Sequence, residues 1–202
     1  MKKFISIVLA LSLVLCAFAY SEEAPAATTP AELEEGQMYF HGYISEIGNY
    51  YVGVPQEWAP IGANSPAAYI EQAEAFMDYY TVRDIISSVN AQNDVLVAAA
   101  PTGESLVLIY GPSEGTTNES LINNMESYQE TLLLSHPGIQ LTEDSGSFKV
   151  TELSSVLRIS AVYMNHKVDQ FYLAAGTQLF IFTFIDTDID VAQAVLTTFQ
   201  LL

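Results

Sequence analysis

Alternating apolar residues near the C-terminal end of the chain predict three consecutive β-strands. The segments Ser155–Met164, Lys167–Leu173 and Gln178–Ile185 have the length and alternation of strands, with turns expected at Asn165-His166 and from Ala174 to Thr177. The last segment is apolar on both faces, so we expect it to lie inside a sheet that is covered on both sides. Its faces are Phe180, Phe182 and Phe184 on one side and Leu179, Ile181 and Ile185 on the other.

Shorter apolar runs earlier in the chain predict further strands. Met38–Glu46 and Tyr50–Val54 flank a turn at residues 47–49, and Pro55 removes a backbone donor where the second strand ends. Val95–Ala100 and Leu106–Tyr110 predict a hairpin that is apolar on both faces. The single tryptophan, Trp58, is expected to fill the core beneath the first turn.

Helical periodicity appears in four places. Pro66–Tyr80 and Thr81–Val89 predict two helices, and Glu119–Ser135 predicts a third, with Asn118 as its N-cap and Pro137 and Gly138 after its end. Asp188 is expected to cap a final helix. The buried stripes would be Leu121, Met125, Tyr128 and Leu132 in the third helix, and Val191, Ala194, Val195, Thr198, Phe199 and Leu202 in the last. A strand meander with segregated helices predicts the α+β class, a central antiparallel sheet flanked by helices.

The N-terminus has the features of an export signal. Lys2 and Lys3 precede an apolar run, and an A-x-A pattern predicts cleavage after Ala19. The run is short for a membrane span and is followed by acidic residues. Lipidation at Cys16 is the minority alternative, because Leu15 stands where lipoprotein signals have a small residue. We therefore expect a signal peptide at 1–19, an acidic Pro/Ala/Thr-rich spacer at 20–36, and one domain at 37–202.

Composition narrows the classes of partner. The chain has 24 acidic and 6 basic residues and a net charge of −18, and loss of the two signal lysines changes this charge to −20. Nucleic acid is excluded as a partner, because binding it requires basic residues that displace counterions. Cleavage after Ala19 would also remove the only cysteine, so the mature domain would be free of disulfides and would depend on an ordinary core.

The first strands and the C-terminal segment together resemble a known family. The stretch Tyr50–Trp58, an extended strand that ends in Pro and then Trp, resembles the start of PsbP-like (DcrB-like) domains. The turn at Gly176-Thr177, the Phe-rich strand and the closing Thr198-Phe199 resemble their end. The resemblance covers about residues 38–202 and implies bacterial envelope or secreted proteins that mostly bind other macromolecules and are generally not enzymes. The plant members assist the oxygen-evolving photosystem, and no residue here matches that role.

One motif suggests catalysis. Residues 111–115 match the nucleophile elbow G-x-S-x-G around Ser113, and Asp144 and His166 follow in the order of a hydrolase triad. The context disagrees, because Gly115 and two threonines separate the serine from the next helix. A turn explains the same residues, so a small extracellular serine hydrolase using Ser113 is the alternative hypothesis and no catalytic residue is assigned.

Metal and cofactor sites have little support in the sequence. Asp186, Asp188 and Asp190 have the spacing of a calcium loop, but the required glycine and bidentate glutamate are missing, and helix capping explains the aspartates. Weak calcium binding to the acidic surface stays open. The three histidines, His41, His136 and His166, are too scattered for a zinc motif, and we expect His136 to complement a helix C-terminus and His166 to lie at a hairpin tip.

The remaining signals are weak. Asn118-Glu119-Ser120 fits a glycosylation sequon, but capping accounts for Asn118. The 12 tyrosines could line a groove for a peptide or glycan, although strand propensity explains most of them. The sequence as a whole predicts a secreted or envelope-associated, non-catalytic binding module without a cofactor, and its partner would be a protein or glycan at the cell envelope.

Overall fold

The computed structural model describes residues 38–61, 71, 95–152 and 154–202. The predicted signal peptide, the lipidation at Cys16, the spacer and the helix at 81–89 lie outside these residues. Of the predicted helix Pro66–Tyr80 only Glu71 is described, and it is helical. Within the described residues, none of the helices has the length and hydropathy that crossing a bilayer requires.

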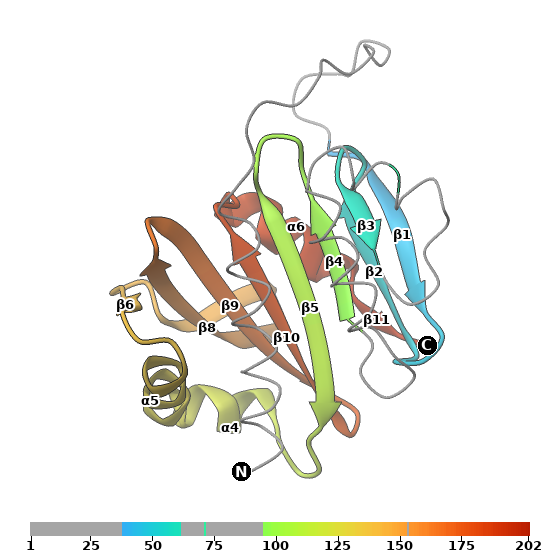
Figure 1. Cartoon of the computed structure of the whole chain (residues 1–202). Helices are drawn as coiled ribbons and strands as arrows, with labels where there is room; N and C mark the ends of the chain where they lie inside the picture. Colours follow the sequence, from blue (N-terminus) through green and yellow to red (C-terminus); the bar gives the residue numbers. More distant parts are fainter. Residues whose placement is uncertain (1–37, 62–70, 72–94, 153) are drawn as a thin grey trace.

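The centre of the molecule is an antiparallel sheet of eight strands, shown in Figure 1. Its path is β3-β4-β5-β10-β9-β8-β6, and β7 also pairs with β8. A second sheet has the order β1-β2-β11. The strands are β1 Phe40–Ser45, β2 Tyr50–Pro55, β3 Ala59–Ile61, β4 Val95–Ala99, β5 Ser105–Pro112, β6 Gln140–Leu141, β7 Gly146–Thr151, β8 Ser154–Tyr163, β9 His166–Ala175, β10 Gln178–Ile185 and β11 Gln200–Leu201.

The predicted meander is confirmed as β8-β9-β10, and the α+β class is confirmed with it. β10 lies between β5 and β9, as its two apolar faces predict. The turn positions differ from the prediction. Met164 and Asn165 form the β8–β9 turn, so His166 is not at its tip but pairs with Tyr163 as the first residue of β9. Strand β9 also continues to Ala175, so the next turn is only Gly176 and Thr177.

Two apolar layers cover the large sheet, one on each face. On one face, Leu121 and Leu132 from helices α4 Asn118–Asn123 and α5 Met125–Ser135 pack with β-strand residues such as Ile181. On the other face, helix α6 Ile189–Thr198 and the small sheet pack on the phenylalanines of β10. Trp58 belongs to this second layer and is buried, as predicted. The hairpin β4–β5 contributes to both layers, which explains its continuous apolar sequence.

The predicted helix Glu119–Ser135 is wrong in two respects. It divides at Asn124 into α4 and α5, and its N-cap is Thr117, whose hydroxyl accepts the N–H of Ser120. Asn118 instead binds β9, because its side-chain oxygen accepts the N–H of Ala174 at 2.7 Å. Both residues are good caps, and this tertiary hydrogen bond determines which one is used.

Asp188 caps α6, as predicted, by accepting the N–H of Asp190 at 2.8 Å. The predicted buried stripe of this helix is partly wrong. The fully buried side chains are Ala192, Val195 and Leu196, whereas Leu202 is exposed beyond β11. The chain leaves the helix at Thr198 because its next residues pair with β2, so Leu202 never reaches the core.

Candidate binding site

The structure separates the three residues of the suggested hydrolase triad. Ser113 follows the end of β5, where its N–H donates to Thr177, at the same end of the sheet as Ala175. His166 is at the opposite end of β9, and a strand rise of about 3.3 Å per residue puts it roughly 30 Å away along the sheet. Asp144 is exposed in the loop between β6 and β7. This geometry brings no base to Ser113.

The three aspartates of the calcium-like spacing do not converge either. Asp186 accepts the N–H of Lys167 at 2.8 Å and lies 2.5 Å from Nδ1 of His166. Asp188 and Asp190 are used at the start of α6, where Asp188 caps the helix. Within the described ranges there is no group of three His, Cys, Asp or Glu side chains that could hold a metal ion. These aspartates therefore have structural partners in the fold.

His136 is buried rather than placed as a charged helix C-cap. Its side chain is 1% exposed, and neither ring nitrogen has a hydrogen-bond partner within the described part of the chain. Burial lowers the pKa of the His136 imidazole, and the Leu132 carbonyl opposes this effect less strongly. The expected positive charge is thus disfavoured. The third histidine, His41, lies 3.0 Å from the carbonyl oxygen of Trp58 through Nε2.

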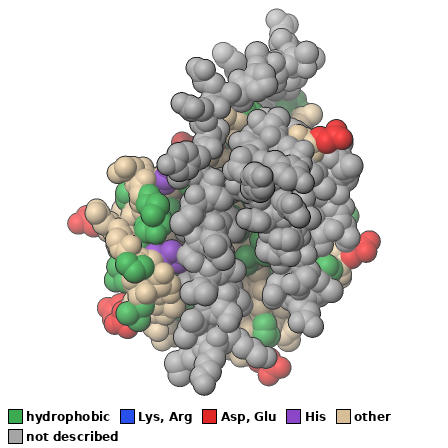
Figure 2. Space-filling view, in the orientation of Figure 1, with side chains coloured by type: hydrophobic (Ala, Val, Ile, Leu, Met, Phe, Trp, Pro, Cys, Tyr) green, Lys and Arg blue, Asp and Glu red, His purple; other side chains and the backbone are tan. Residues whose placement is uncertain are grey.

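Exposed apolar side chains flank His136 and its neighbour Tyr163. Leu133 and Leu134 are in the last turn of α5, just before His136, and Met164 directly follows Tyr163. Leu134 is 84% exposed and Met164 is 56% exposed. We call Leu133, Leu134 and Met164 the α5–β8 apolar surface. Figure 2 shows hydrophobic and histidine side chains gathered on the side of the molecule where Figure 1 places α5, β6 and β8.

Met164 has an unusual backbone for an exposed methionine. Its φ is +51° and that of Asn165 is +69°, the conformation of a two-residue turn with both central residues left-handed. Asn, Asp and Gly are preferred in this turn, because a longer L side chain in the left-handed region costs about 1–2 kcal/mol. Asn165 follows the preference and Met164 does not. Packing does not compensate, since the Met164 side chain is largely exposed.

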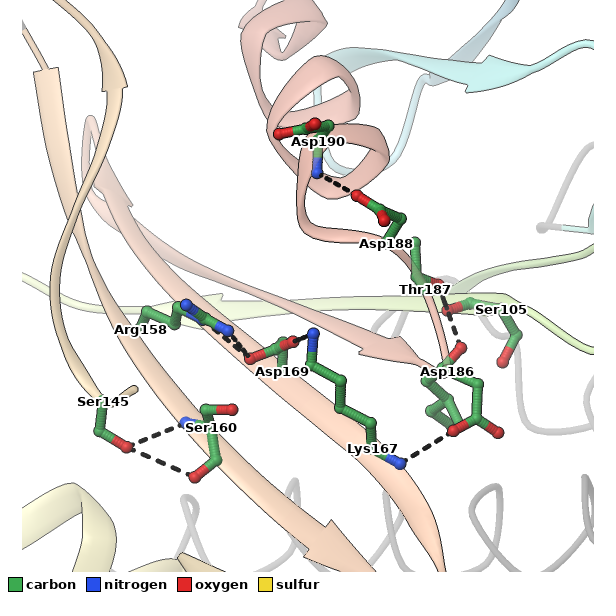
Figure 3. A network of polar contacts seen from close by, with 11 residues as sticks. Ser105, Ser145, Arg158, Ser160, Lys167, Asp169, Asp186, Thr187, Asp188 and Asp190 are labelled. Atoms are coloured by element: carbon green, nitrogen blue, oxygen red, sulfur yellow. Dashed lines mark hydrogen bonds and ion pairs between the residues drawn. The ribbon is translucent and has the colours of Figure 1, made fainter. Parts of the chain in front are cut away.

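A polar cluster lies on the opposite face of the same hairpin, the face that carries α6 (Figure 3). Arg158 on β8 donates through Nε to Oδ1 of Asp169 on β9 at 2.8 Å, and its Nη2 forms an ion pair with the same oxygen at 2.7 Å. Nζ of Lys167 lies 3.2 Å from the other oxygen of the same carboxylate. The Arg158 guanidinium also lies 5.9 Å from the centre of the Phe148 ring. One buried carboxylate is therefore held between two cations.

Neither feature of this hairpin was predicted from the sequence. The run Leu132–Leu134 was a usable signal, because one helical face can bury only part of three consecutive leucines. The clustering of basic residues was a second signal, since Lys149, Arg158 and Lys167 lie near one another in a chain that has only 6 basic residues. Their common position on three neighbouring strands could only be known from the strand register.

No family model matches the chain, and no similar sequence is found among curated proteins. Among solved structures the chain is similar to the solution structure of cyanobacterial PsbP (CyanoP) from Synechocystis sp. PCC 6803, with a TM-score of 0.47 and 10% sequence identity. The match covers 86% of this chain and 98% of that one. A similarity of this size assigns no ligand, partner or family. Membership of the PsbP-like family, which the sequence resemblance suggests, stays a prediction.

Proposed function

We propose that this chain is an extracytoplasmic, non-catalytic binding module that docks a protein partner on the α5–β8 apolar surface. The observation that carries the proposal is the exposed Met164 in a left-handed turn position. A residue that strains the backbone without packing inward is best explained by a contact made outside the fold. Methionine suits such a contact, because its flexible thioether adapts to the shape of a partner.

The leucines of α5 extend this surface. An exposed leucine on its own needs no explanation, but apolar side chains grouped beside one another are typical of protein interfaces. Leu133 and Leu134 come from a helix whose buried side is already formed by Leu132, so folding does not require them to be apolar. Their apolar character is consistent with burial against a second molecule.

Charge defines the chemistry of that partner. Glu130 is exposed on α5, four residues before Leu134, which puts it on the same side of the helix. The whole chain carries a net charge of −18. A complementary partner would have an apolar centre with a basic rim, and opposite charges would accelerate the encounter at low ionic strength.

The proposed location rests on the N-terminal sequence, with its basic start, apolar run and A-x-A pattern. The alternative, a serine hydrolase that uses Ser113, is less well supported because His166 lies at the other end of β9. A glycan partner is also less well supported, because the exposed groups of this surface are aliphatic and a methionine rather than stacked aromatic rings.

A pair of matched variants tests the proposal. Leu134→Glu introduces a charge into the α5–β8 apolar surface, and Ile44→Glu introduces the same charge at an exposed isoleucine on β1. Tagged full-length proteins would be expressed, chemically crosslinked in whole cells and purified from the envelope and medium fractions. We expect a discrete crosslinked species with wild type and Ile44→Glu, reduced about tenfold in Leu134→Glu, whose thermal unfolding should be unchanged.

Equal crosslinking by both variants would contradict the proposed surface. The hydrolase alternative has its own readout in the same preparations. A fluorophosphonate probe should not label the protein, and labelling that disappears in Ser113→Ala would reverse the choice between a binding module and an enzyme.

A further inference from the structure

The positive charge of the described residues is confined to one region of the large sheet. Every Lys and Arg in residues 38–61, 95–152 and 154–202 lies on β7, β8 or β9, and these are Lys149, Arg158 and Lys167. Arg158 and Lys167 share the face that carries α6, because both contact Asp169. Asp169 is the carboxylate that both side chains contact, and Asp186 accepts the backbone N–H of Lys167 at 2.8 Å.

The two cations have donors that Asp169 does not use. Arg158 contacts this carboxylate through Nε and Nη2, which leaves its Nη1 donors outside this ion pair. The Lys167 ammonium group forms an ion pair with one oxygen of Asp169, and the Lys167 side chain is 44% exposed. Arg158 binds Oδ1 and Lys167 is nearest to Oδ2, so one carboxylate holds the two cations close to each other.

Ser160 supplies an independent observation. It is the cross-strand neighbour of Asp169, so the two side chains point to the same face of the sheet. Ser160 is 1% exposed, and its hydroxyl has no hydrogen-bond partner among the described residues. In Figure 3 this hydroxyl points toward the side where Asp169 and Lys167 lie, while the Ser160 backbone is bound by Ser145. A buried hydroxyl without a partner is destabilising, and a ligand acceptor would remove this penalty.

The strand next to Arg158 leaves room for a ligand. Gly146 on β7 is the cross-strand neighbour of Arg158, and a Cβ built there would meet no atom within 4 Å. The exposed Lys167 side chain borders the proposed site on the other side. Its flexible stem allows it to move and admit a ligand.

We propose that Arg158, Lys167 and Ser160 form a binding site for a small oxyanion, a carboxylate or a phosphate group. Arg158 Nη1 and the Lys167 ammonium would donate to two oxygens of the anion, and the Ser160 hydroxyl would donate to one of them. Asp169 holds both cations in place and, by its own charge, limits the affinity to the millimolar range. The site lies on the opposite face of the sheet from the α5–β8 apolar surface and does not depend on the function proposed for it.

The test is a titration of the isotope-labelled protein followed by amide chemical shifts. Sodium phosphate and sodium acetate would be added separately at constant ionic strength, with sodium chloride as the balancing salt. We expect saturable shifts confined to residues around Arg158, Ser160 and Lys167. The phosphate and acetate arms show which oxyanion the site prefers.

Two lysine variants of equal charge control for general electrostatics. Lys167→Gln removes a proposed ligand contact. Lys149→Gln removes a positive charge on the nearby strand β7 that pairs with Glu152 and is not part of the proposed site. We expect Lys167→Gln to weaken the apparent affinity about tenfold and Ser160→Ala about threefold, with Lys149→Gln unchanged. Thermal unfolding of each variant confirms that it is folded.

Shifts that stay linear with concentration, or that spread over the surface with both anions, would overturn the proposal. The same conclusion would follow if Lys167→Gln and Lys149→Gln weakened binding equally, because the response would then reflect net charge alone.

Discussion

His136 lies edge-on to Tyr163, with the ring centres 5.8 Å apart and the ring planes at 81°. This contact joins the end of α5 to β8, in the middle of the residues that form the α5–β8 apolar surface. Since His136 is buried without a hydrogen-bond partner among the described residues, its neutral form is the one that fits this place. Protonation of His136 would therefore destabilise the contact between α5 and β8.

The stability of the protein should decrease as the pH falls below the ordinary histidine pKa of about 6.5. Burial holds the pKa of His136 lower in the folded state, so between the two pKa values the unfolded chain binds more protons. The free energy of unfolding therefore decreases as the pH is lowered through that window. Urea denaturation at pH 7.5 and 5.5 should show a larger loss of unfolding free energy in wild type than in His136→Phe. This variant keeps an aromatic ring against Tyr163 and retains the other two histidines. Equal losses in the two proteins would show that another group is responsible.

Replacing Met164 should separate stability from binding. Met164→Asn introduces a residue that tolerates the left-handed backbone, and we expect it to raise the free energy of unfolding by about 1 kcal/mol. The same change should weaken crosslinking to the partner, because it removes an apolar contact. Met164→Leu is the control, since it keeps both the strain and the apolar surface and should resemble wild type. A loss of stability in Met164→Asn would mean that Met164 has a structural role.

The buried and the exposed ion pairs should differ strongly in their contribution to stability. Asp169→Asn leaves the 13% exposed Arg158 without its counter-charge, and we expect a loss of about 3 kcal/mol in urea denaturation. Glu152→Gln removes the partner of Lys149 in a pair that is exposed at both ends, and the loss should be below about 0.5 kcal/mol. Similar losses in the two variants would contradict the burial assigned to Asp169.

The close packing of β2 on α6 predicts a specific rescue. The N–H of Gly53 donates to the Thr198 hydroxyl at 2.7 Å, and a Cβ on Gly53 would lie 2.9 Å from Cγ2 of Thr198. Gly53→Ala should therefore destabilise the protein by about 1–2 kcal/mol through overpacking. Adding Thr198→Ser removes the methyl group but keeps the hydroxyl, so it should recover part of the loss. A double-mutant cycle without coupling would show that the clash is relieved elsewhere.

The large sheet was predictable where local pattern and burial agree. The residues of β10 alternate between two apolar faces, and only a central strand can bury both, so its place in the meander follows from its sequence. The short strands were not predictable. β6 and β11 have two residues each and exist because β8 and β2 offer them backbone partners.

The candidate sites were less predictable than the fold. By residue type Asn118 is the better cap of the two, and its hydrogen bond from Ala174 explains why Thr117 caps the helix instead. The cluster around Asp169 depends on a cross-strand register that a one-residue slip would reverse. The triad suggested by Ser113 was wrong in its geometry for the same reason, since order along the chain does not fix distance across a sheet.

Site-specific photocrosslinking tests the proposed docking surface most directly. Benzoyl-phenylalanine would replace Leu134 in one full-length protein and Ile44 in another, so that each probe stands at an exposed apolar position. Irradiation of intact cells should give one discrete adduct from position 134, sensitive to salt and suppressed by Met164→Asn, and none from position 44. Adducts of the same pattern from both positions, or from neither, would contradict a partner docked on the α5–β8 apolar surface.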